Sequence, residues 1–217
     1  MKLFVQCGIQ YLMDWNKENT GQVKLYQGLG RWVKQYASDK RFKRYVEIGT
    51  WNGRGSTICV AAGFESRTDS PVLLSLETNY DRYSEAKHFW KDYKSIQVEH
   101  CRILSDENLP TFEVIQTVHT NIVNEWHYDD IVSFKSASYI NTDSYEVAIL
   151  DGGEYMTYFE YKKLLPHVMV FLLDDTCVQK CKKIVEELNE NPEWRCVDFS
   201  ITERNGWHVF ERRSSNN

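Results

Sequence analysis

The chain has 217 residues, a formal net charge of −5 and a hydrophobic content of 42%. This length suits a single domain, 1–217, with a substantial core, and a net negative charge gives no field that would gather nucleic-acid phosphates. Because the sequence has no apolar window of about 18 residues and no signal-peptide pattern, we expect a cytoplasmic protein without membrane insertion.

The first 40 residues, 1–40, carry apolar side chains at helical spacing, which predicts a cap segment of one or two helices ahead of the main sheet. Across the core, 41–213, short apolar runs alternate with helical patterns. Five of these runs are expected to be strands: RYVEIG, PVLLSLE, SIQVEHCRIL, YEVAILD and VMVFLLDD. Nearly continuous apolar strands that alternate with helices are typical of an α/β fold, in which a parallel sheet is covered by helices on both faces.

Two segments depart from this alternation. EWRCVDFSI and GWHVFERR are strand-like runs joined by TERN, which predicts a C-terminal antiparallel hairpin at the edge of the sheet. The segment 107–145 is longer than a bare connection and is expected to hold one or two helices. Since loops at the carboxyl ends of strands carry specificity, we expect this insertion, with the cap segment, to form a lid that selects the substrate.

The stretch YVEIGTWNGRGST, residues 45–57, is the first candidate site. Its glycines, Gly49, Gly53 and Gly55, permit positive φ and close backbone approach, and Ser56 can begin a helix whose N-terminus attracts an anion. A triphosphate-binding loop would need Lys where this chain has Gly55, and the spacing G-x-x-x-G-x-G does not match the dinucleotide fingerprint. Neither ligand therefore fits the turn well.

S-adenosylmethionine accounts better for the acidic residues. Glu47 stands two residues before Gly49, where its carboxylate could receive the ammonium group of the methionine moiety, directly or through water. Glu77 ends the second strand and is suited to accept both ribose hydroxyls. After the third strand, Ser105 or Asp106 could reach the adenine edge. The alternative is that the two glutamates only cap or solvate strand ends.

With these features, the chain from about residue 45 to residue 212 resembles the class I S-adenosylmethionine-dependent methyltransferases. The resemblance implies a Rossmann-like, seven-stranded, mostly parallel sheet with a reversed terminal hairpin, in agreement with the pattern of the tail. Trp51 flanks the expected crevice and could stack on adenine or on a sugar, or it could simply pack in the core.

Three aspartates follow the next two strands. Asp151 ends the fourth strand, and Asp174 and Asp175 end the fifth. Neighbouring tips of a parallel sheet lie side by side, so these carboxylates should converge. Their oxygens suit a hard cation such as Mg²⁺, which can bind two vicinal oxygens of an acceptor and ease its deprotonation. One of the pair Asp174 and Asp175 could instead cap the following helix, and Asp151 could hold the cofactor.

This arrangement resembles the metal-dependent sugar O-methyltransferases of the macrocin type. The resemblance implies that Asp151, Asp174 and Asp175 hold the metal, and that Asp151 and the residue three positions later take part in catalysis. That residue is Glu154, where relatives place His or Lys as the general base. A glutamate could serve as the base if burial raises its pKa, or it could be a further metal ligand.

The sequence thus predicts an S-adenosylmethionine-dependent O-methyltransferase for a small acceptor, a sugar of a glycan or of a glycosylated product, assisted by Mg²⁺. A methyltransferase for catechol-like phenols would use similar metal chemistry, and a non-catalytic binding protein could retain the same fold. A nucleic-acid methyltransferase is disfavoured, because the chain lacks both a basic track and the Asn/Asp-Pro-Pro-Tyr/Phe motif. A homo-oligomer and a domain of a larger glycan-synthesis enzyme are both compatible with the sequence.

Overall fold

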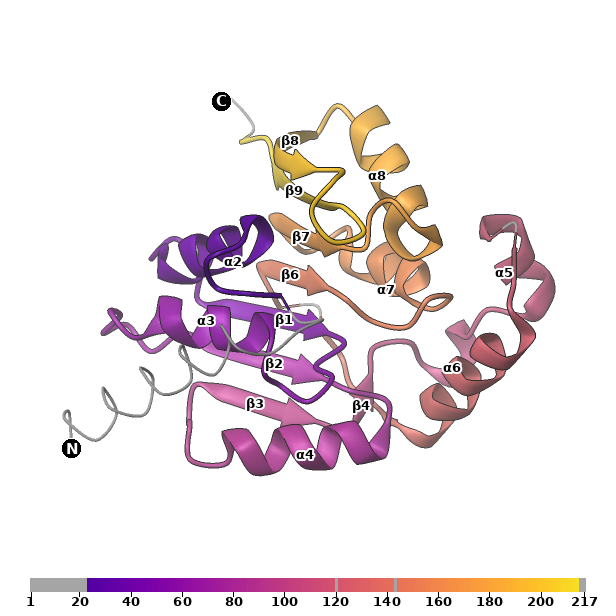
Figure 1. Cartoon of the computed structure of the whole chain (residues 1–217), viewed down its shortest axis with the longest axis horizontal. Helices are drawn as coiled ribbons and strands as arrows, with labels where there is room; N and C mark the ends of the chain where they lie inside the picture. Colours follow the sequence, from indigo (N-terminus) through magenta and orange to yellow (C-terminus); the bar gives the residue numbers. More distant parts are fainter. Residues whose placement is uncertain (1–22, 120, 143, 215–217) are drawn as a thin grey trace.

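The computed structural model describes residues 23–119, 121–142 and 144–214. The centre of these ranges is a sheet with the strand order β3-β2-β1-β6-β7-β9-β8 (Figure 1). A separate two-stranded sheet joins β4 to β5. The strands are β1 (Arg44–Ile48), β2 (Val72–Leu76), β3 (Ile96–Glu99), β4 (Cys101–Arg102), β5 (Ser138–Tyr139), β6 (Val147–Leu150), β7 (Val170–Asp174), β8 (Trp194–Ser200) and β9 (Trp207–Arg212).

The pairing within the large sheet confirms the predicted fold class. β1 pairs in parallel with both β2 and β6, and β3 and β7 extend the parallel part on either side. β9 runs antiparallel to both β7 and β8, which makes the reversed terminal hairpin. Since the chain builds outward from β1 to β3 and then returns to place β6 beside β1, the order reverses between β1 and β6. In open α/β sheets, ligands bind outside the carboxyl ends of the strands at such a point.

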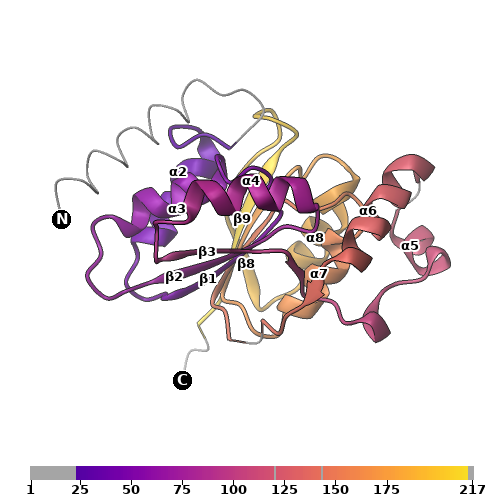
Figure 2. The ribbon, with the colours of Figure 1, turned by 90° about the horizontal axis from the view of Figure 1, so that it is seen from below.

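Helices cover both faces of this sheet, and the two-residue period of the strands explains how. In β1, Tyr45 packs in the core cluster that contains helices α2, α3 and α4, whereas Val46 packs in the cluster that contains α7 and α8. Figure 2 shows α2, α3 and α4 together on one side of the strands. These helices are α2 (Gly28–Ser38), α3 (Ser56–Phe64), α4 (Tyr80–Trp90), α7 (Thr157–Leu164) and α8 (Gln179–Glu190).

The predicted helical character of the segment between β4 and β6 is also found. It contains a 3₁₀ turn, η1 (Asp106–Asn108), and two helices, α5 (Phe112–Val118) and α6 (Asn124–Ser136). Both helices lie beyond the carboxyl ends of the strands (Figure 1). A small core formed by Leu104, Ile115, Phe134, Tyr155 and Met156 joins them to the start of α7.

The predicted N-terminal cap is seen in part. α2 accounts for its second half, while the first 22 residues lie outside the described ranges. α2 buries one face that includes Leu29, Val33 and Tyr36, which is the helical spacing seen in the sequence. Within the described ranges, no helix is both long and apolar enough to cross a bilayer.

Candidate functional site

The glycine turn after β1 is built by close packing. Gly49 and Gly53 have backbone φ angles of 87° and 74°, which residues other than glycine rarely adopt. A Cβ atom on Gly49 would lie 2.2 Å from the carbonyl oxygen of Asp151, so the turn rests directly on the end of β6. Gly53 accepts a hydrogen bond of 2.8 Å from the Trp90 indole and has no room for a side chain there. These two glycines therefore shape the turn and bring β1 and β6 together.

Glu77, at the end of β2, fastens this turn. Its carboxylate accepts hydrogen bonds from the backbone N–H groups of Trp51 (2.7 Å) and Asn79 (2.9 Å). The residue is 8% exposed, and burial raises the pKa of its carboxyl group. Because each carboxylate oxygen can accept more than one hydrogen bond, Glu77 retains acceptor capacity toward the cavity that it lines.

Glu47 lies deeper than expected for a residue that contacts a ligand. It has no exposed surface and accepts hydrogen bonds from the hydroxyl groups of Thr57 (2.7 Å) and Ser75. Its other oxygen has no hydrogen-bond partner among the described residues, and burial raises the pKa of the group. In this structure Glu47 ties the start of α3 to β2, and its predicted contact with the methionine ammonium stays a prediction.

A cavity of about 230 Å³ lies between the glycine turn, β2, β6 and α6. It brings together four of the predicted site residues: Gly49, Trp51, Glu77 and Asp151. α6 closes it on one side, where Asp130 accepts a hydrogen bond of 3.1 Å from the backbone N–H of Tyr155. The other lining residues are Ile48, Leu76, Thr78, Asn79, Cys101, Asp129, Asp130, Ser133, Phe134, Gly152, Gly153 and Glu160.

The remaining predicted cofactor residues do not line this cavity. Gly55 and Ser56 lie where the turn becomes α3, behind Gly53. Ser105 and Asp106 lie at η1, where the Asp106 carboxylate pairs with Arg102 at 2.5 Å and its side chain is 84% exposed. A role for these residues in binding the cofactor stays a prediction.

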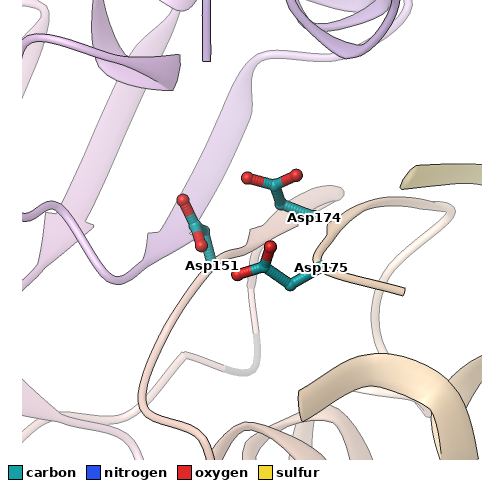
Figure 3. Close-up of side chains that lie close together, drawn as sticks. All are labelled: Asp151, Asp174 and Asp175. Atoms are coloured by element: carbon teal, nitrogen blue, oxygen red, sulfur yellow. The ribbon is translucent and has the colours of Figure 1, made fainter. Parts of the chain in front are cut away.

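The three aspartates converge as the sequence predicted. Asp151, Asp174 and Asp175 each place a carboxylate oxygen within 4.8 Å of the others (Figure 3). Successive residues of a strand point to opposite faces, but Asp175 has a φ of 55°, and this left-handed conformation turns the chain at the end of β7. The alternative role of Asp175 as a helix cap is not found, because α8 begins at Gln179 and no side chain caps it.

Two cationic side chains and an amide already contact this cluster. The Lys180 ammonium lies 2.8 Å from Asp151 Oδ1 and 2.6 Å from Asp175 Oδ2. Arg204, in the β8–β9 loop, binds Asp174, with Nη2 2.7 Å from Oδ2 and Nε 3.2 Å from Oδ1. Asn205 donates a hydrogen bond of 3.0 Å to Asp175 Oδ1. Lys180, Arg204 and Asn205 were not among the predicted site residues.

Burial and charge act against each other in the cluster. Burial raises the pKa of Asp174, and the nearby Asp151 raises it further, although Arg204 opposes both effects. Burial would also raise the pKa of Asp175, but Lys180 and Asn205 outweigh this effect and hold it below its ordinary value. For Lys180, burial alone would lower the pKa, whereas Asp151 and Asp175 raise it, so the group is a charged ammonium.

The donor set fits a hard divalent cation in its chemistry. Three carboxylates supply the oxygen ligands that Mg²⁺ prefers, at separations that one ion could span. A divalent ion bridging Asp151 and Asp175 would have to take nearly the position of the Lys180 ammonium, which contacts the same two carboxylates. A metal bound by these residues would therefore compete with the Lys180 ammonium for Asp151 and Asp175.

Glu154 faces a second pocket, of about 640 Å³, between the end of α5 and the start of α8. Burial raises the pKa of its carboxyl group, and the charge of Lys180 opposes that rise. Glu154 does not line the cavity that Glu77 lines. Its role as the general base stays a prediction.

Glu160, on α7, also lines the cavity that contains Glu77 and Asp151. It was not among the site residues predicted from the sequence. It is 1% exposed, and its Oε2 atom has no hydrogen-bond partner among the described residues. Burial, with smaller contributions from the charges of Asp130 and Glu77, raises the pKa of Glu160 to about 8. No motif marks it, because TYFEYKKL reads as an ordinary helix.

The fold is that of solved methyltransferase structures. The SAH-bound methyltransferase PaMTH1 of Podospora anserina has a TM-score of 0.58 and 14% identity, over 95% of this chain and 88% of that chain. An O-methyltransferase of Bacillus cereus in complex with SAH has a TM-score of 0.58 and 12% identity, over 94% and 90%. TomG of Streptomyces achromogenes, an O-methyltransferase involved in tomaymycin synthesis and solved with SAM, has a TM-score of 0.52 and 13% identity, over 85% and 79%. The sequence matches no protein-family model and no curated protein.

Proposed function

We propose that the protein transfers a methyl group from S-adenosylmethionine to a hydroxyl group of a small acceptor. The observation that carries this proposal is the cavity at the reversal point between β1 and β6, which joins the glycine turn to Glu77 and Asp151. PaMTH1 and the Bacillus cereus enzyme share this fold and are solved with SAH, and TomG is solved with SAM.

The charge of the cavity supports a cationic cofactor. Five carboxyl groups line it, those of Glu77, Asp129, Asp130, Asp151 and Glu160. Because burial raises the pKa of Glu160 to about 8, that group is mostly neutral at pH 7, and the negative charge comes from among the other four. A dinucleotide would bring its pyrophosphate into this acidic site, whereas S-adenosylmethionine brings a sulfonium and an ammonium group. Glu77 would accept the ribose hydroxyls, and Asp151 would face the methionine end.

For the acceptor, we propose a sugar of a glycan or of a glycosylated product. The pocket beside Glu154 is lined by polar groups, among them Asn121 and Gln179. The side-chain amide of Gln179 accepts a hydrogen bond of 3.3 Å from the backbone N–H of Asn121 and donates one of 2.7 Å to its backbone carbonyl. No aromatic ring is found among the described residues that line this pocket. A ring with many hydroxyl groups suits such walls better than the flat phenol of the alternative acceptor. The segment 107–145 supplies α5 and α6 around both pockets, which supports its proposed role as a lid.

In the proposed reaction, Glu154 takes the proton of the acceptor hydroxyl. The oxygen then forms a bond to the methyl carbon as the carbon–sulfur bond breaks, and S-adenosylhomocysteine leaves. Asp151, Asp174 and Asp175 would hold Mg²⁺, which, when bound, polarises the acceptor oxygen. The chain's own contribution is to hold the acceptor oxygen in line with the methyl–sulfur bond, close to the methyl carbon, and to exclude water.

The proposal is tested by calorimetric titration of S-adenosylhomocysteine into the wild type, Glu77→Ala and Glu99→Ala. Glu99 ends the neighbouring strand β3 and pairs with Lys87 at the surface, so it is the matched control. We expect Glu77→Ala to weaken binding at least about tenfold, since it removes the acceptor of two hydroxyl groups, and Glu99→Ala to leave it unchanged. A wild type that does not bind S-adenosylhomocysteine would refute the proposed function.

Transfer of the methyl group is then followed by mass spectrometry with sugars and catechols as acceptors. Product from a sugar supports the proposed acceptor, and product from a catechol alone would favour the phenol alternative. If the cofactor binds but no acceptor is methylated, the non-catalytic binding protein is favoured.

A further inference from the structure

We propose that Lys180 is the resident counter-cation of the aspartate cluster, and that a divalent cation binds there only by displacing the Lys180 ammonium. This inference deepens the proposed function, on which it rests for the identity of the site. It concerns how the chain controls access of metal to that site, and its first consequence is that the wild-type protein holds divalent cations weakly.

The position of Lys180 follows from the local fold. It is the second residue of α8, which begins five residues after β7 ends. Side chains of a helix lean toward its N-terminus, so Lys180 points back toward the tips of β6 and β7. Its side chain is 11% exposed, and those of Asp151 and Asp175 are 25% and 15% exposed. Lys180 is therefore an interior ion-pair partner rather than a solvated surface lysine.

Five of the six carboxylate oxygens of the cluster already contact a cation or an amide. Both oxygens of Asp174 face Arg204, and the two oxygens of Asp175 contact Lys180 and Asn205. Asp151 Oδ1 contacts Lys180. An added ion would have to compete with the Lys180 ammonium for Asp151 and Asp175.

The charge balance leads to the same conclusion. Among the groups in direct contact, three carboxylates face Lys180 and Arg204 and leave one net negative charge, which attracts a divalent ion less than the cluster without Lys180 would. Without Lys180 the cluster would carry two net negative charges, which a divalent ion would neutralise. Removing one partner of a buried ion pair leaves the other charge uncompensated. The affinity of the cluster for a cation should therefore rise when Lys180 is replaced by an uncharged residue.

The test measures Mn²⁺ binding by the loss of the electron paramagnetic resonance signal of free Mn²⁺, on the full chain. We compare the wild type with Lys180→Met and Lys180→Gln, which keep an unbranched side chain but remove the charge. Lys183→Met is the matched control, because Lys183 lies on the same helix and pairs with Glu186 outside the cluster. Far-UV circular dichroism establishes that each variant is folded.

We expect Lys180→Met and Lys180→Gln to lower the Kd for Mn²⁺ at least about tenfold relative to the wild type, and Lys183→Met to leave it unchanged. Adding Asp151→Asn to Lys180→Met should abolish the gain. If the folded Lys180 variants bind Mn²⁺ no more tightly than the wild type, the proposal is wrong. If only one of the variants Lys180→Met and Lys180→Gln is folded, the Mn²⁺ affinity of that variant alone decides between these outcomes.

Calorimetry with S-adenosylhomocysteine on the same samples separates this proposal from the proposed function. Cofactor binding without a gain in Mn²⁺ affinity would overturn the role of Lys180 alone. A gain in Mn²⁺ affinity without cofactor binding would support the role of Lys180 and refute the methyltransferase.

Discussion

Replacing Glu160 with Gln tests whether the first cavity holds a neutral carboxylic acid. In the folded protein the pKa of Glu160 is about 8, against an ordinary value of 4.5. The substitution keeps the shape of the side chain but removes its proton equilibrium. Any pH dependence of stability that Glu160 causes should therefore disappear in Glu160→Gln.

The sign of the effect follows from the protons bound in each state. Between about pH 4.5 and pH 8 the unfolded chain has lost the Glu160 proton while the folded protein retains it. The unfolded state then binds fewer protons, so the contribution of Glu160 to the free energy of unfolding falls as the pH rises. Below this window the group contributes nothing, and above it the loss is complete. A shift of this size corresponds to roughly 4 to 5 kcal/mol at most, at about 1.4 kcal/mol per pKa unit.

The assay is urea unfolding of the wild type and Glu160→Gln at about pH 5, 6.5 and 8. The variant should match the wild type at the lowest pH and exceed its stability by several kcal/mol at the highest, with an intermediate gain between them. Glu190→Gln, at the exposed end of α8, is the control and should follow the wild type at every pH. A difference between Glu160→Gln and the wild type that does not change with pH would refute the reasoning.

Three further substitutions probe the rest of the site. Gly49→Ala should lower the free energy of unfolding by about 1 to 3 kcal/mol or more in urea titrations, because its φ is 87° and the added Cβ meets the Asp151 carbonyl; full stability would contradict this packing. Arg204→Ala should cost about 3 to 5 kcal/mol by leaving fully buried Asp174 without its cation, and adding Asp174→Asn should restore part of that loss. Glu154→Gln should lower kcat at least about a hundredfold while calorimetry finds unchanged affinity for S-adenosylhomocysteine; an unchanged kcat would remove Glu154 as the base.

The aspartate cluster shows where sequence reasoning succeeds. Asp151 and Asp174 each stand at the end of a long apolar run, and parallel neighbouring strands place their carboxyl ends at one edge. Their convergence needed no knowledge of distant contacts. Glu77 was predictable in the same way, because it ends β2 beside the glycine turn after β1.

The position of a residue along a strand does not indicate which distant side chains it will contact. Glu47 stands one residue before the end of β1, and its buried carboxylate accepts hydrogen bonds from Thr57 and Ser75 and does not line the cavity. Ser105 and Asp106 lie at η1, where Asp106 pairs with Arg102, a contact that the sequence did not indicate; their role beside the adenine stays a prediction.

The sequence by itself determined the alternation of strands and helices, the reversed hairpin and the meeting of the aspartates, because these depend on local periodicity and on the shared direction of parallel strands. Only the tertiary structure decided which charges face those aspartates. Arg204 lies 30 residues after Asp174 and reaches it because β9 runs antiparallel to β7, pairing Asp174 with Trp207. Lys180, near the start of α8, reaches Asp151 after β6 and Asp175 after β7 at the same time. Such pairings depend on distances between elements, which no local pattern of residues encodes.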